Sequence, residues 1–268
     1  GRKVILSQNE KLWISALGTF RVSTGRNGPV QWKSRKAEDI FKFLLIKRGR
    51  PVHRDIIVEA IWPDVEVDEA EFRFYKAISR LYRSLEPSGN AKGSSYIQCR
   101  DGAYWIDFSK VAFFDVQCFQ ETVNKASFIH EREGIERAIP LYLEAENLYK
   151  GDLFEGNIYQ QWMESERERL KKDYIKVLSR LSTYYHESGD YWKSIEYCLK
   201  RLNYERFSCE AHILLMKNYA LSGEIFEAIM TYRRYEQMLK EEMGISPSFS
   251  VIKTYEEIIK KFHEGERP

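Results

Sequence analysis

The stretch Asp68 to Glu86 reads DEAEFRFYKAISRLYRSLE, and it combines an apolar and a basic periodicity. Apolar residues recur there at offsets of 0, +4, +7 and +11, which a 3.6-residue period gathers into one stripe. These residues are Phe74, Ile78, Leu81 and Leu85. Basic residues recur at 0, +3, +7 and +10 on the opposite side, and they are Arg73, Lys76, Arg80 and Arg83. The pattern predicts a helix that is apolar on one side and cationic on the other.

The ends of this helix carry their own signals. Asp68, followed three residues later by Glu71, is a capping pattern, and Pro87 with Gly89 ends the segment. Such a helix suits the major groove of DNA, because its apolar side attaches it to a domain while its guanidinium groups reach phosphates and guanine edges. Most charged helix faces are simply solvated, so the neighbouring segments must decide between the two interpretations.

The charge of the chain is unevenly distributed. Residues 1–110 contain 20 Lys and Arg against 13 Asp and Glu, a net +7, whereas residues 111–268 contain 22 against 27, a net −5. The N-terminal part is therefore the expected polyanion binder. A length of 268 residues allows two domains. The chain begins Gly-Arg-Lys rather than Met, as expected of a segment of a longer protein.

Several classes of protein find no support in the sequence. The cysteines form no CxxC pair and no zinc-type cluster, which predicts buried thiols in a reduced cytoplasm; they are Cys99, Cys118, Cys198 and Cys209. No apolar run approaches the ~18 residues of a membrane span. No phosphate loop, nucleophile elbow or HExxH motif occurs, and the histidines are scattered at 53, 130, 186, 212 and 263. We therefore expect no enzyme, no cofactor and no metal site.

The segments before the cationic helix predict a short sheet and two further helices. Leu12 to Val22 and Val30 to Trp32 are expected strands separated by turn residues. A first helix begins after Ser34 and ends at Gly49, with an inner face of Ala37, Ile40, Phe41, Leu44 and Leu45. A second helix runs from near His53 to Trp62-Pro63, with an inner face of Ile56, Ile57, Ala60 and Ile61.

A β-hairpin is expected after the cationic helix. Ser95 to Cys99 and Ala103 to Asp107 are β-prone runs on either side of Asp101-Gly102, a dipeptide that favours a type I′ turn. Three helices followed by a hairpin form a winged helix, in which the third helix reads the major groove and the hairpin lies along the backbone.

The second half contains an internal repeat. Gly189-Asp190-Tyr191 and Gly223-Glu224-Ile225 lie 34 residues apart, and a small residue follows each Gly by five positions. This period is the tetratricopeptide signature, and such helix pairs stack into a superhelix with a concave protein-binding surface. Ala138-Ile139 marks an earlier helix pair, which is separated from the next by 56 residues because a glycine loop and the Trp162 helix intervene. The many aromatic residues are more typical of repeat core than of a ligand pocket.

Together these stretches resemble the SARP family of bacterial transcription activators. The three helices, ISRLYRSLEP at Ile78 to Pro87 and the GAYWID hairpin resemble its OmpR/PhoB-type winged helix. Four later stretches resemble its bacterial transcriptional activation domain: Gly151 to Phe154, Trp162 to Leu170 (WMESERERL), Glu241 to Pro247 (EEMGISP) and Tyr255 to Ile258. The resemblance implies a mainly α chain with a small β component. It implies a winged-helix DNA-binding domain at 10–110 and an all-α, tetratricopeptide-like activation domain at 111–264.

The resemblance also implies which residues of the third helix face the bases of DNA. The matching positions are Arg73, Lys76, Ser79, Arg80 and Arg83, with Arg80 as the foremost candidate. Phe72 stands where a polar residue is expected, and it either meets a thymine methyl group or covers the domain junction. Glu69 either accepts from a cytosine amino group or turns toward the helix N-terminus, where the dipole favours it.

Backbone contacts are expected from the other two helices and from the wing. The matching residues are Lys33, Arg35, Lys36, Arg54, Arg100 and Tyr104. Arg35 and Lys36 are equally understood as ordinary surface residues of a first turn. The loop before the third helix resembles the segment through which this class touches RNA polymerase, with Trp62, Asp64 and Glu66 as its contacts, although acidic loops are usually just solvated.

These observations predict a cytoplasmic, nucleoid-associated transcription activator without enzymatic activity. It would bind double-stranded promoter DNA as a homodimer on direct repeats and recruit RNA polymerase through its σ and core subunits. One alternative is a protein-interaction scaffold whose repeat domain binds a peptide or an upstream sensor. Another is a regulator gated by a small molecule in the repeat groove. Neither the target operon nor the activating signal follows from the sequence.

Overall fold

The computed structural model describes residues 11–25, 28–87, 93–156 and 160–265, which form two compact units. The first unit comprises Gly1–Cys118 and Leu148–Leu170, and the second comprises Phe119–Asn147 and Lys171–Pro268. This division by compactness differs from the predicted division after residue 110, because 111–118 and 148–170 pack with the first unit. In the described ranges no helix is long and apolar enough to cross a membrane.

The first unit opens with a four-stranded sheet in the order β3-β2-β1-β7. Its strands are β1 (Leu12–Ser15), β2 (Arg21–Thr24), β3 (Gly28–Pro29) and β7 (Val111–Phe114). β1 pairs antiparallel with β2 but parallel with β7, a strand that local patterns did not predict. The short sheet is thus confirmed, although its third strand lies at Gly28–Pro29 and not at the predicted Val30 to Trp32.

Three helices follow this sheet, as predicted. They are α1 (Arg35–Ile46), α2 (Arg54–Ile61) and α3 (Val67–Leu85). The predicted inner face of α1 is buried throughout, and its N-cap Ser34 accepts a hydrogen bond from the Ala37 N–H at 3.1 Å. In α2 only Ile57 and Ile61 are buried, and Ile56 is 54% exposed, so the predicted inward position of Ile56 is wrong. A helix of this length buries one narrow face.

The apolar stripe of α3 is confirmed, since all four of its predicted members are buried. Ala70 and Ala77 complete the same face, which packs against α1. The helix starts at Val67 with Glu66 as its N-cap and no side-chain capping bond, so the capping role predicted for Asp68 is wrong.

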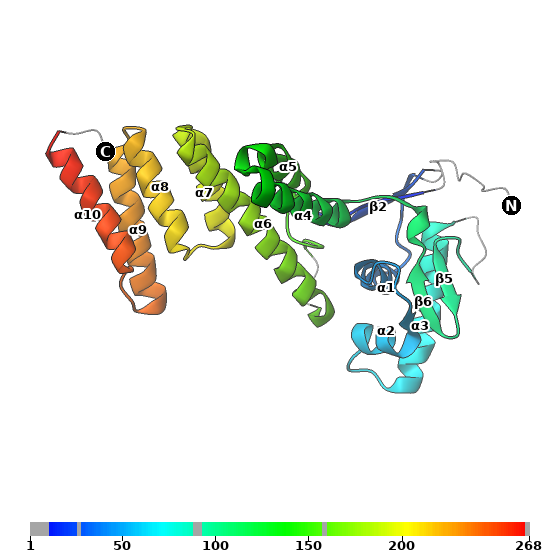
Figure 1. Cartoon of the computed structure of the whole chain (residues 1–268). Coiled ribbons are helices and arrows are strands. Elements are labelled where there is room, and N and C mark those ends of the chain that lie inside the picture. The colour runs from blue at the N-terminus through cyan, green and yellow to red at the C-terminus, as the bar shows by residue number, and fades with distance from the viewer. Residues whose placement is uncertain (1–10, 26–27, 88–92, 157–159, 266–268) are drawn as a thin grey trace. The chain divides into compact units, whose positions relative to one another are not determined.

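The wing is a three-stranded sheet in the order β4-β6-β5 (Figure 1). It consists of β4 (Val52–His53), β5 (Ile97–Arg100) and β6 (Ala103–Ile106), and the short helix η2 (Phe108–Lys110) leads on to β7. Asp101 and Gly102 have φ angles of +50° and +76°, which a type I′ turn requires at both central positions. The predicted hairpin is confirmed, and with it the winged helix.

A segment far along the chain completes the first unit. Residues 16–18 exchange backbone hydrogen bonds with 152–155: Phe154 N–H donates to the Ala16 carbonyl at 2.8 Å, and Gly18 N–H donates to the Asp152 carbonyl at 3.0 Å. On the other side, the Asp115 carboxylate accepts from Ala16 N–H at 2.8 and 2.9 Å. Residues 16–18, which follow β1, are therefore hydrogen-bonded to two segments that lie far along the sequence, at Asp115 and at 152–155.

Phe154 and Lys42 meet within this join. Phe154 is fully buried at a φ of +54°, a left-handed conformation that is unusual for a bulky residue. Lys42 is only 1% exposed; its ammonium pairs with Glu38 and lies 4.5 Å from the Phe20 ring centroid and 5.4 Å from that of Phe154. Burial lowers the pKa of Lys42, and the Glu38 carboxylate opposes that effect.

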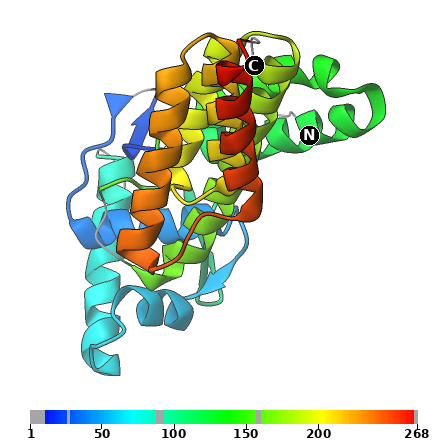
Figure 2. The same ribbon diagram turned by 90° about the vertical axis from the view of Figure 1, so that its left-hand side faces the viewer.

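The second unit is built from antiparallel helices. The helices that supply it are α4 (Asp115–Glu133), α5 (Ile135–Leu148), α6 (Gln161–Glu187), α7 (Tyr191–Tyr204), α8 (Cys209–Leu221), α9 (Ile225–Met243) and α10 (Phe249–His263). Figures 1 and 2 show α8, α9 and α10 packed side by side. The predicted inter-helix turns occur at Gly189 and Gly223, both at positive φ. Ser194 and Ala228 are buried five positions on, so the 34-residue repeat is confirmed.

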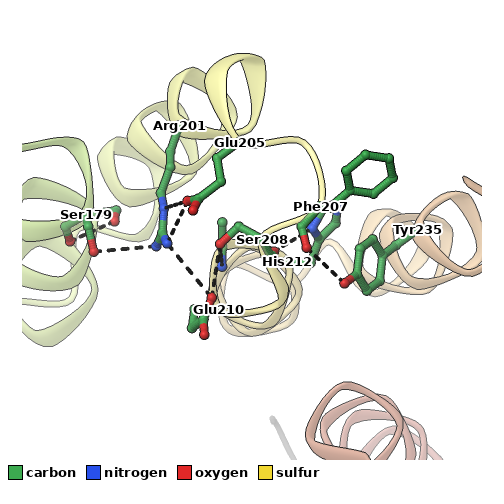
Figure 3. A network of polar contacts seen from close by, with 10 residues as sticks. Ser179, Arg201, Glu205, Phe207, Ser208, Glu210, His212 and Tyr235 are labelled. Atoms are coloured by element: carbon green, nitrogen blue, oxygen red, sulfur yellow. Dashed lines mark hydrogen bonds and ion pairs between the residues drawn. The ribbon is translucent and has the colours of Figure 1, made fainter. Parts of the chain in front are cut away.

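Polar contacts tie the repeats together at the α7–α8 connection (Figure 3). Arg201 of α7 donates to Glu205 at 3.0 Å and to Ser179 of α6 at 3.4 Å. In α8, His212 is buried and stacks on Tyr235 of α9 at 4.0 Å between ring centroids. Its Nδ1 lies 2.8 Å from the Ser208 carbonyl oxygen, to which it donates. Burial lowers the pKa of His212.

Phe154→Ala should destabilise the first unit by about 3 kcal/mol, because it leaves a cavity and removes an aromatic partner of Lys42. Urea unfolding of the full chain measures the change. Phe249→Ala is the matched control: Phe249 is largely exposed, and its removal should change the free energy of unfolding by less than about 0.5 kcal/mol. Equal losses for both variants would contradict the role given to Phe154.

The lowered pKa of His212 makes folding dependent on pH. The folded state binds a proton at His212 less well than the unfolded state does. The contribution of the neutral His212 side chain to the free energy of unfolding is therefore fully present above about pH 6.5, the ordinary histidine pKa, and is lost as the pH falls below that value. His212→Gln should reduce that fall by up to about 1.4 kcal/mol per pH unit, the limit for one proton. Urea unfolding between pH 8 and about pH 5.5 tests this. A slope that His212→Gln leaves unchanged would contradict this assignment.

Candidate nucleic-acid interface

The cationic side of α3 faces solvent. Arg73, Lys76, Arg80 and Arg83 are all exposed, while the opposite side of the helix is buried against α1 and the wing strand β6. Phe72 lies on the same exposed side and is 69% exposed. Ser79 is half-buried between the two sides. The structure therefore brings the predicted recognition residues onto one accessible surface.

Glu69 pairs with Arg73 and does not turn toward the helix N-terminus, the second of its two predicted arrangements. Its carboxylate accepts from Arg73 Nε at 3.1 Å and also pairs with the second guanidinium nitrogen. Both side chains are about half exposed, and an exposed ion pair one helical turn apart is worth less than about 0.5 kcal/mol. This pair neutralises Arg73 only weakly, so a stronger anion can replace the Glu69 carboxylate.

A hollow of about 340 Å³ lies between the start of α1 and the cationic side of α3. Five basic residues line it: Arg35 and Lys36 from α1, and Arg73, Lys76 and Arg80 from α3. Ser34, Trp62 and Ala77 complete the lining. The predicted contacts of two helices thus converge on one concave, positively charged surface.

Lys36 and Trp62 form part of the wall of this hollow. Lys36 Nζ donates to the Ile61 carbonyl at 2.8 Å and lies 5.6 Å from the Trp62 ring centroid. Trp62 is only 6% exposed, so its predicted contact with RNA polymerase does not fit the structure. Asp64 and Glu66 are exposed, as such a contact requires. Trp62 was assigned to this contact because the loop resembles the family's contact segment, yet its indole is part of the core.

The wing contributes Arg100 but not Tyr104. The Arg100 side chain is exposed near the hairpin tip, with Asp101 at 3.4 Å. Tyr104 is 7% exposed, and its ring packs edge-on against Phe74 at 5.3 Å between centroids. Burial raises the pKa of Tyr104. The predicted backbone contact of Tyr104 is therefore withdrawn, because its inward strand position places it behind α3.

Arg54 and Lys33, two further predicted contacts with the DNA backbone, differ in whether the side chain already has a partner. Arg54 is held beside α3 by Glu71 at 2.6 Å and by the Tyr75 ring at 5.7 Å. Lys33 is exposed, while its backbone N–H donates to Ser84 Oγ at 2.9 Å and so joins the start of α1 to α3. Lys33 is available to an anion at once, whereas Arg54 must first leave its carboxylate partner.

The four cysteines are free thiols that differ in their exposure. Cys198 is buried, and burial raises its pKa to about 11, but Cys99 is exposed on β5, so the predicted burial of all four thiols is wrong. Within residues 11–25, 28–87, 93–156 and 160–265, no group of three His, Cys, Asp or Glu side chains could hold a metal ion.

Comparison with known proteins identifies a family and several similar solved structures, two of which are described below. The family model of the bacterial transcriptional activator domain (BTAD) matches residues 114–259, more than half of the chain. The structure of Mycobacterium tuberculosis EmbR in complex with a low-affinity phosphopeptide is similar at a TM-score of 0.73 and 18% identity. That match covers 94% of this chain and 66% of the EmbR chain, just under two thirds of its length. At this identity it shows the fold, and it confirms the predicted fold class.

A second structure is similar over a smaller part of the chain. It is the C-terminal TPR-containing domain of an FK506-binding protein from Plasmodium falciparum, with a TM-score of 0.42 and 18% identity. The match covers 56% of this chain and 92% of that one. A comparison with curated proteins found no match.

Proposed function

The chain belongs to the bacterial transcriptional activator domain family, and we propose that it activates transcription by binding promoter DNA and recruiting RNA polymerase. Family membership supports the coarser statement, that this is a transcription activator of the SARP type. The finer proposal concerns how it reaches DNA and the polymerase. We also propose that the protein acts in the cytoplasm, at the nucleoid, because promoter DNA is found there.

One observation carries the proposal of DNA binding: the exposed cationic side of α3, held outward by a fully buried apolar side. A helix of this kind enters the major groove while its domain contacts the flanking backbone. The exposed hairpin with Arg100 at its tip supplies a second contact with the phosphates. The residues proposed to touch DNA are Phe72, Arg73, Lys76, Ser79, Arg80, Arg83, Lys33, Arg35, Lys36, Arg54 and Arg100.

The polymerase contact is proposed for the loop between α2 and α3. Asp64 and Glu66 are exposed there and suit a basic surface of the σ or core subunits. We propose further that two protomers bind direct repeats about one helical turn apart, since each winged helix spans one half-site. Both statements rest on the resemblance to the family.

A second function, binding of a protein segment by the repeats, is favoured by one observation. Trp192 and Phe226 occupy the same position of consecutive 34-residue repeats, and both rings are largely exposed. Large aromatic side chains repeated on a surface are typical of protein interaction sites. EmbR was solved with a bound phosphopeptide, and a peptide ligand is the comparable proposal for this chain.

The experiment that tests DNA binding is selection of preferred duplexes from random DNA by the full chain, followed by gel shifts with unlabelled competitor. Preferred duplexes should survive competitor that removes random DNA. Binding that shows no preference over competitor would favour the scaffold interpretation.

Arg83→Ala should weaken binding to the selected duplex by about 1 to 3 kcal/mol and relax preference at one base pair, because a bidentate contact to guanine is lost. Arg100→Ala should weaken binding to all duplexes alike and reduce the slope of log affinity against log salt by about one. Gel shifts over a salt series measure both effects.

The matched control is Arg233→Ala, which removes an exposed arginine from α9 of the second unit. Its affinity for DNA should equal that of the unchanged chain. Equal, sequence-independent losses for Arg83→Ala and Arg100→Ala would contradict the assignment of Arg83 to base reading.

A further inference from the structure

We propose that the hollow between α1 and α3 holds one phosphate of the DNA backbone, and that Arg80 is a phosphate contact and not a reader of bases. This inference rests on the proposed function and specifies it. It reverses the role that the sequence alone suggests for Arg80.

Uncompensated positive charge converges on the hollow. Arg73 is paired with Glu69, and Lys36 is engaged by the Ile61 carbonyl, with Asp39 at 3.8 Å. For Arg35, Lys76 and Arg80 the described part of the chain shows no ion pair. Three like charges that share one concavity repel each other, and a phosphate placed among them turns that repulsion into attraction.

The hollow is held open by the core of the unit. α1 and α3 pack against each other, Ala37 of α1 and Ala77 of α3 are buried, and the Lys33 N–H bond to Ser84 adds a direct link. The spacing between Arg35 and Arg80 therefore does not depend on DNA. At about 30 Å³ per water, the hollow has room for a phosphate group together with several water molecules.

The position of Arg80 around α3 supports the same role. At about 100° per residue, Arg73 and Arg80 lie within about 20° of each other, next to Ala77 and Ser84, which face α1. Arg83 and Phe72 lie about 60° and 80° further round than Arg80, on the exposed part of the helix that points away from its buried side. The half-buried Ser79 lies about 100° further round, at the edge of that part. A helix inserted in the major groove turns its outermost line to the bases and its flanks to the sugar-phosphate walls.

This geometry assigns phosphate contacts and base contacts to different residues. Arg73, Arg80 and Arg35 hold the backbone on the α1 side, with Lys76 at the rim of the hollow. Base reading is left to Phe72, Ser79 and Arg83. Phosphate contacts place the helix in its register, and the neighbouring line supplies the specificity.

The test is a methylphosphonate scan of a selected duplex, bound by the full chain and measured by gel shift. Each neutral linkage removes one phosphate charge. At the phosphate that enters the hollow, the neutral linkage should weaken binding by the unchanged chain about tenfold, as expected for one charge-assisted contact. The same linkage should cost Arg80→Ala and Arg35→Ala much less, because those variants have already lost the contact.

Two further variants separate the possible roles of Arg80. Arg80→Lys keeps a positive charge that can still bind a phosphate, so it should keep most of the affinity and an unchanged sequence preference. A residue that reads a base should change the preference when its donor geometry changes. Arg83→Ala, on the same helix but outside the lining, should keep the full tenfold effect of the neutral linkage. Circular dichroism confirms that each variant is folded.

Each result decides between the hypotheses. If the linkage effect disappears in Arg80→Ala and persists in Arg83→Ala, the phosphate site is supported. If Arg80→Lys changes the preferred base pair, or no linkage couples to Arg80, this inference is overturned while DNA binding stands. Inorganic phosphate added as a competitor should inhibit DNA binding by the unchanged chain more than by Arg80→Ala. If it inhibits both equally, the anion binds elsewhere and the hollow is not its site. If no duplex is preferred over competitor, the proposed function fails, and this inference with it.

Discussion

Burial of the apolar side of α3 is the constraint on which the functional surface depends. Phe74 and Leu81 are completely buried, so the helix has a single rotational setting about its axis. That setting turns the guanidinium groups outward, and packing against α1 places two further cations beside them. A rotation of one residue position would bury a charge without a partner, at a cost of several kcal/mol. The cationic surface is therefore a consequence of core packing.

The first unit is more than a winged helix, because a distant part of the chain completes it. Residues 152–155 pair with 16–18, and Asp115 holds the same short stretch through its carboxylate. The buried Lys42 lies against the Phe154 ring, which is part of the stretch Gly151 to Phe154. A motif that resembles part of the activation domain is thus a structural element of the first unit.

The second unit is held together in a different way. Among the later helices, α7 contacts α8, α8 contacts α9, and α10 contacts both α8 and α9. The half-buried Arg201 bonds from α7 to Ser179 of α6, and the buried His212 stacks from α8 on Tyr235 of α9. Contacts of this kind are local in sequence, which is typical of repeat proteins. The unit therefore offers a regular framework on which exposed aromatic residues such as Trp192 and Phe226 recur at fixed intervals.

The sequence by itself determined the three helices of the winged helix, the type I′ hairpin and the 34-residue repeat, because each depends on residues a few positions apart or on a repeated local pattern. It also identified the cationic side of α3. Only the tertiary structure decided that β7 pairs with β1, that 152–155 join the first unit, and that Trp62 and Tyr104 are buried. It also decided that Arg80 shares a hollow with Arg35. These features join positions between about 26 and 138 residues apart, and no local periodicity records which distant segments meet.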